Sequence, residues 1–163
     1  MMQSKYFIGK SSVESSPLSK DKQTEVSQRI QTMLDATRTD WARYLYLTGE
    51  PDLRWIETFD QYHDRDQIQQ LIGRSNPKDF SNDYVVTCCE FGAVLGYVMV
   101  SLQPRLRWHY EWPYWESALF DPQSGNLVPP FHWAVKKMSE YGVDDGFAAK
   151  VEACLQILDQ KAK

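Results

Sequence analysis

The segment from Tyr84 to Leu102 constrains the fold most, because Glu90 is its only charged residue. Its length is close to the roughly 20 residues that a membrane-spanning helix needs. A charge at mid-span would cost about 2.5–3.5 kcal/mol on insertion, and the rest of the chain is amphipathic enough to cover an apolar helix. We therefore expect a helix from about Asp83 to Gln103 at the buried centre of the fold, and no membrane association.

Two glycines, Gly92 and Gly96, lie four residues apart on one face of this expected helix. Each glycine costs a helix about 0.8–1.0 kcal/mol relative to alanine, so the pair predicts that another element packs close to the backbone there. The same spacing mediates helix dimerisation in membranes. An architectural subunit whose helix packs against a second copy is therefore one alternative, and close packing within the chain is the interpretation we favour.

Helical periodicity also precedes the central segment. Apolar residues recur at three- and four-residue spacing from about Lys20 to Leu47, which is typical of one helical face. Thr39 and Asp40 are good capping residues for a second helix, so the sequence allows either one helix or two over this stretch. Shorter helices are expected over residues 53–59 and 68–72, where the same spacing returns.

After the central helix the apolar period changes from about four to two. Residues 106–112 alternate between apolar and polar, which predicts a half-buried strand. A second strand is expected over residues 115–120, a turn over 121–126, and a short returning strand at 127–128. The region should form a small antiparallel sheet of two to three short strands, about residues 106–128.

Two helices are expected at the C-terminal end of the chain. Pro130 suits the first turn of a helix from Phe131 to Glu140, and Asp144 or Asp145 would cap the last one. The inward face of the last helix is expected to hold Phe147, Val151, Cys154, Leu155 and Leu158. The predicted fold class is α+β and mostly helical, with a central buried helix, a small sheet and two C-terminal helices.

The chain of 163 residues is long enough for one hydrophobic core. Residues 1–18 are polar and rich in serine, so we expect a flexible N-terminal arm and a single globular domain over residues 19–163. Three cysteines, Cys88, Cys89 and Cys154, are an odd number with two adjacent, which is no disulfide framework. Reduced thiols and the lack of an apolar signal-peptide core indicate a cytoplasmic protein.

The block from Phe91 to Lys137 resembles a loosely defined group of uncharacterised bacterial domains. The resemblance lies in the glycine-bearing stretch Phe91–Gly96, in Trp108, and in Pro130-Phe131 with Val135 and Lys136, about a third of the chain. Many members of that group carry an acidic residue after the second glycine, where this chain has Tyr97. The resemblance implies the order helix, sheet, helix, and it implies no activity.

Rings and carboxylates gather in residues 108–116, which indicates a binding surface. Stacking rings and hydrogen-bond acceptors suit a sugar or an aromatic peptide. The candidate binding residues are Trp112, Tyr114, Trp115, Glu111 and Glu116. Glu90 is a possible buried acid, either a general acid or base with a raised pKa or part of a structural ion pair.

No catalytic or metal-binding motif is present in the sequence. The three histidines are scattered, and no spacing of cysteine and histidine matches a zinc site. Nucleophile elbows and phosphate-binding loops are also missing. The formal net charge of −4, without a run of Lys and Arg, argues against nucleic acid. We therefore expect no catalytic residue, no metal and no cofactor.

The sequence favours a small non-enzymatic protein-binding module of a bacterial cytosol, with another protein as its partner. One concrete version is a toxin-neutralising immunity protein, a class that is small, acidic and free of catalytic motifs. The alternative is a small carboxylate-dependent hydrolase or sugar-binding protein that uses residues 108–116. The sequence does not indicate an oligomeric state.

Overall fold

The computed structural model describes residues 9–10, 17–45, 52–62, 83–138 and 146–161. Their side chains are described except at 9–10, 37–45, 62, 83–87, 137–138 and 160–161. In chain order the elements are β1 (Gly9–Lys10), α1 (Lys20–Leu45), α2 (Leu53–Tyr62), α4 (Asp83–Leu102), β2 (Arg107–His109), the 3-10 helix η1 (Tyr114–Glu116), β3 (Ala118–Phe120), β4 (Asn126–Val128), α5 (Pro130–Met138) and α6 (Phe147–Lys161).

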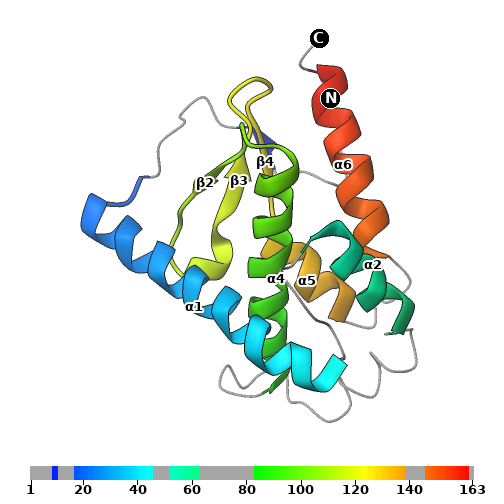
Figure 1. Ribbon diagram of the computed structural model, residues 1–163. Helices are drawn as coiled ribbons and strands as arrows, with labels where there is room; N and C mark the ends of the chain where they lie inside the picture. Colours follow the sequence, from blue (N-terminus) through cyan, green and yellow to red (C-terminus); the bar gives the residue numbers. More distant parts are fainter. Residues whose placement is uncertain (1–8, 11–16, 46–51, 63–82, 139–145, 162–163) are drawn as a thin grey trace.

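Helix α4 lies at the centre of the molecule, as the apolar segment predicted. Figure 1 shows it between α1 and the sheet on one side and α2 and α6 on the other. It contacts α1, α5 and α6, and every residue from Cys88 to Gly96 is buried. None of the helices that the structure describes is long and apolar enough to cross a membrane.

Helix α1 is one continuous helix of 26 residues, so the division at Thr39 and Asp40 that we considered is wrong. The stretch contains neither glycine nor proline, so nothing in it breaks the backbone hydrogen bonds. The start of the helix is capped by Ser19, whose Oγ accepts a hydrogen bond from the Lys22 amide at 3.2 Å.

Aromatic rings join α2, α4 and α6 in the core. The Phe91 ring on α4 lies 4.2 Å from that of Phe59 on α2 and 4.6 Å from that of Phe147 on α6, measured between centroids. Trp55 lies 5.7 Å from Phe91 on the α2 side. All four rings are buried, so this cluster fixes the two outer helices on the central one.

The sheet is antiparallel, with the strand order β1-β4-β3-β2. Three of its strands lie in the predicted region, and the fourth, β1, comes from the predicted N-terminal arm and pairs Gly9 with Leu127. The second strand does not start at Trp115 as expected, because residues 114–116 form η1. His109 pairs with Ala118, and the eight residues between them reverse the chain without adding to either strand.

The C-terminal helices confirm the predicted α+β class. Helix α5 begins at Pro130, one residue before the predicted start, and α6 buries Phe147, Val151, Cys154 and Leu158 with Leu155 half-buried. The carboxylate of Asp60 on α2 caps α6 by accepting hydrogen bonds from the Phe147 and Ala148 amides at 3.1 and 2.9 Å. The predicted caps at 144–145 and the predicted helix over 68–72 lie outside the described residues.

Candidate binding surface

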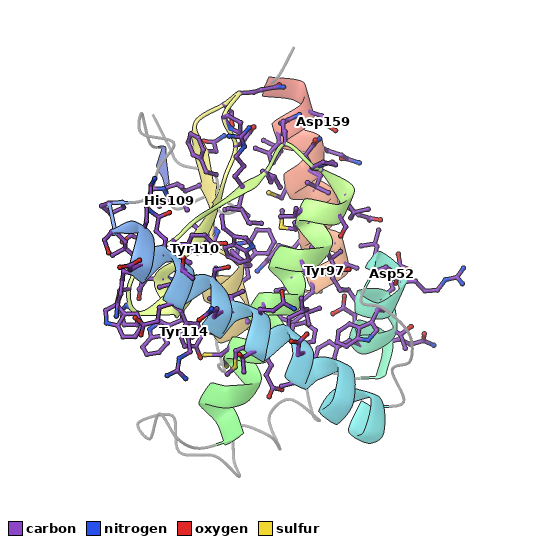
Figure 2. All side chains as sticks on the ribbon, turned by 60° about the vertical axis from the view of Figure 1, so that its left-hand side comes forward. Asp52, Tyr97, His109, Tyr110, Tyr114 and Asp159 are labelled. Carbon is purple, nitrogen blue, oxygen red and sulfur yellow. The ribbon has the colours of Figure 1, made fainter. Side chains whose placement is uncertain are left out.

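The connection between β2 and β3, residues 110–117, carries most of the candidate residues. Figure 2 shows its Tyr110 and Tyr114 beside α1, with His109 at the end of β2. Two hydrogen bonds link residues within the connection. The Ser117 Oγ accepts a hydrogen bond from the Glu111 amide at 3.0 Å, and the Glu116 amide donates to the Pro113 carbonyl at 2.9 Å. These bonds hold the segment in one conformation, although it lies outside the regular strands.

Tyr114 and Trp115, two of the predicted binding rings, pack inward. The Tyr114 ring meets Phe131 edge-on at 5.9 Å and Trp115 at 5.2 Å between centroids. Its hydroxyl is hydrogen-bonded to the thiol of Cys89 on α4, and burial together with this bond raises the pKa of Tyr114 above its ordinary value. Both rings pack against the hydrophobic core, so they attach the segment to the core.

Trp112 is the ring of this segment that faces solvent, with 48% of its surface exposed. The Lys22 ammonium of α1 lies over it, with Nζ 3.6 Å from the ring centroid. Lys22 Nζ is also 3.1 Å from the Glu25 Oε2 atom one turn further along the helix. The ring is therefore presented at the junction of α1 and the β2–β3 connection, with a cation already on it.

The two candidate carboxylates of this segment each lie beside a histidine. Glu111 Oε1 is 3.2 Å from the Nε2 atom of His109, and Glu116 Oε2 is 3.2 Å from the Nε2 atom of His132 on α5. His109 is buried, and its Nδ1 atom has no hydrogen-bond partner among the described residues. The structure thus places each of the two carboxylates within hydrogen-bond distance of an imidazole ring.

Glu90 is buried in α4, with 7% of its surface exposed. Its negative charge raises the pKa of both Cys89 and Tyr114, which indicates that it lies near them. For Cys89 the larger cause of the raised pKa is burial, which keeps the thiol protonated and unreactive. Glu90 is therefore close to the Cys89 thiol and the Tyr114 hydroxyl, which form a hydrogen bond with each other.

The two glycines of α4 lie against aromatic residues of the same chain. A Cβ atom at Gly92 would come within 2.3 Å of the Phe131 ring, and one at Gly96 within 2.4 Å of the Trp108 ring. These rings come from α5 and β2, so the close approach joins α4 to both the last helices and the sheet. The glycine face is filled from within the chain, which leaves no room there for a second copy.

A buried ion pair that the sequence did not reveal holds the turn after β3. The carboxylate of Asp121 is fully buried and accepts hydrogen bonds from Arg105 Nε at 2.9 Å and from Ser124 Oγ at 2.6 Å. Arg105 also donates to the Leu158 carbonyl of α6 at 3.1 Å. Burial alone would raise the pKa of Asp121, but the hydrogen bonds from Arg105 and Ser124 outweigh it and the pKa is lowered.

Among the described residues, no three side chains of His, Cys, Asp or Glu are grouped as a metal site requires. All three cysteines are buried, and none of them forms a disulfide. Comparison of the chain with protein-family models, with curated proteins and with solved structures finds no match. The geometry of residues 110–117 is therefore the basis on which a function is argued.

Proposed function

We propose that this protein is a non-enzymatic protein-binding module whose contact surface is centred on Trp112 and includes Glu111 and Glu116 of the same segment. We call these three residues the Trp112 surface. The observation that carries the proposal is the exposure of the Trp112 ring on a segment whose other rings pack against the core. Tryptophan is enriched at the centres of protein interfaces, where one buried ring supplies much of the binding energy.

The rigidity of the segment supports this proposal. Ser117 ties the chain at Glu111, and Tyr114 is fixed between Phe131 and Trp115. A partner that covers Trp112 would therefore not have to order a mobile loop, and the entropic cost of binding is correspondingly smaller. An exposed tryptophan on a fixed segment is an arrangement typical of a preorganised interface.

Within this class we propose a toxin-neutralising immunity protein as the specific form. What supports it is the combination of a small chain, a net charge of −4 and an exposed aromatic anchor flanked by carboxylates. Such a surface complements a basic partner, as the nucleic-acid-binding face of a nuclease toxin would be. This assignment rests on analogy with a class of proteins, and identifying the partner protein tests it.

The experiment is an affinity capture from native lysate with three forms of the tagged protein: wild type, Trp112→Ala and Leu102→Ala. Leu102 is a matched control, because 46% of its surface is exposed and it ends α4, outside the β2–β3 connection. We expect wild type and Leu102→Ala to retain one stoichiometric protein that Trp112→Ala loses. Retention by the Trp112 variant, or no stoichiometric protein with the wild type, would refute the proposal.

A second candidate is a carboxylate-dependent hydrolase or sugar-binding protein, and the two Glu–His pairs favour it. A carboxylate beside an imidazole is suited to proton transfer in hydrolysis. Binding of the wild type to a glycan array, lost in Trp112→Ala, would support sugar recognition. Hydrolysis of a bound glycan that stops in Glu111→Gln or Glu116→Gln, while the variant stays folded, would establish the enzyme. If the wild type binds no glycan on the array, this candidate is refuted.

A further inference from the structure

The Trp112 ring holds a cation that belongs to the protein itself. Lys22 Nζ lies 3.6 Å from the ring centroid. We infer that the Trp112 ring is a recognition site for a cationic side chain, which Lys22 occupies in the free protein and an Arg or Lys of a basic partner protein occupies in the complex. This inference rests on the proposed function and adds to it the chemistry of the partner.

The geometry of the ring supports a site of this kind. An aromatic face attracts an ammonium or guanidinium group within about 6 Å of its centroid, and tryptophan does so most strongly. Lys22 shows that a cation fits over the ring while nearly half of the Trp112 surface stays exposed. A guanidinium group is planar and less strongly hydrated than an ammonium, so arginine stacks on such a face better than lysine does.

Lys22 is held in a way that allows it to be displaced. Its ammonium reaches the ring on a flexible four-carbon stem, and its other contact is the exposed pair with Glu25, whose side chain is 48% exposed. Exposed ion pairs of this kind contribute little stability. When a partner's cation replaces Lys22 on the ring, Lys22 can turn into solvent and Glu25 becomes available to the incoming cation.

The carboxylates of α1 and of the β2–β3 connection favour a basic partner over an acidic one. Glu25 lies at the Lys22 ammonium, and Glu111 precedes Trp112 in the chain. Glu116 is exposed beside His132 at the end of η1. With the net charge of −4, these carboxylates attract cationic segments and repel acidic ones.

The test uses the full chain labelled with 5-fluorotryptophan, in which the Trp112 resonance is assigned from its loss in Trp112→Phe. The probe is a synthetic peptide of alternating Arg and Gly, and a Glu-Gly peptide of the same length is the control. Lys22→Ala is compared with Lys20→Ala, which makes the same change of charge. Lys20 is exposed and lies two positions away on α1, where side chains do not share a face.

We expect the Arg-Gly peptide to shift the Trp112 resonance and to bind Lys22→Ala about two- to fivefold more tightly than Lys20→Ala, because the competing cation is gone. The Glu-Gly peptide should leave the resonance in place. Equal affinities of the two lysine variants, or no shift with the Arg-Gly peptide, would overturn the inference. If Trp112→Ala still loses a captured protein partner in that case, the proposed function stands and only the partner's chemistry is wrong.

Discussion

Replacing Gly92 by alanine tests whether α4 and α5 are as close as the structure shows. The added Cβ would lie 2.3 Å from the Cδ1 atom of Phe131 and 2.9 Å from its Cα atom. Carbon atoms in contact prefer about 3.5–4.0 Å, so a ring rotation can relieve only the first overlap. The second involves the backbone, and α5 itself would have to move away from α4.

The magnitude follows from two opposing effects. Overpacking a well-packed core costs about 1–3 kcal/mol, and the backbone overlap puts this site near the upper end. Alanine regains about 0.8–1.0 kcal/mol of helix propensity over glycine. We expect Gly92→Ala to lower the free energy of unfolding by about 1–2 kcal/mol. Gly96→Ala should cost less, because its overlaps under 3.0 Å are with the Trp108 ring and not with backbone.

The assay is urea denaturation followed by far-UV circular dichroism and by tryptophan fluorescence, so that agreement of the two probes tests the two-state assumption. Ser101→Ala is the control for propensity, since Ser101 is exposed on the same helix and the change creates no overlap. A second variant, Phe131→Leu, is combined with Gly92→Ala in a double-mutant cycle. The coupling should be about 1 kcal/mol, with the smaller side chain relieving part of the cost.

Two results would refute the reasoning. Gly92→Ala with a stability equal to or above that of the wild type would mean that α5 does not lie against the glycine. A coupling near zero with Phe131→Leu would mean that the Phe131 side chain contributes nothing to the cost.

Three further predictions concern the groups that join distant elements. Asp60→Ala should cost about 1–2 kcal/mol, because α6 loses its N-terminal cap; Asp60→Asn should cost less, because its one carboxamide oxygen still accepts from an amide of α6, and equal losses in urea denaturation would argue against capping. Asp121→Asn should cost about 1–3 kcal/mol at pH 7, since it weakens the buried pair with Arg105. The folded-state pKa of Asp121 lies below its ordinary value of 3.8, so its stabilisation is present above that pH and disappears as the pH falls through the folded-state pKa. The wild type should therefore lose more stability than Asp121→Asn between pH 5 and pH 2, and parallel curves would contradict the lowered pKa. Burial and the nearby Asp121 raise the pKa of Cys154 to about 12, so iodoacetamide at pH 8 should label its thiol in urea and not in the native protein, as mass spectrometry would show.

The binding segment shows how far sequence patterns reach into function. The sequence located the rings and carboxylates of residues 108–116, because their density is visible along the chain. It did not separate Trp112 from Tyr114 and Trp115, since all three rings suit a core and a surface alike. What distinguishes Tyr114 is its contact with two residues of other helices, Phe131 on α5 and Cys89 on α4.

Local periodicity in the sequence determined the class of the fold and most of its elements. Helix α4 was predicted from its apolar length, and the start of α5 from a proline that suits the first turn. These signals are visible because hydrogen bonds within a helix and the alternation of a strand join residues close in the chain. The sheet region was also predicted, but the extent of β2 and β3 was not.

The tertiary structure alone decided which distant residues meet. The cap that Asp60 supplies to α6, the pairing of Arg105 with Asp121, and the Lys22 ammonium on the Trp112 ring each join separate elements. No single residue type or spacing predicts such a contact, because a carboxylate or a ring accepts many partners and topology selects one. The two glycines of α4 predicted that another element packs close to the helix, and only the tertiary structure showed that the neighbouring residues are Phe131 and Trp108.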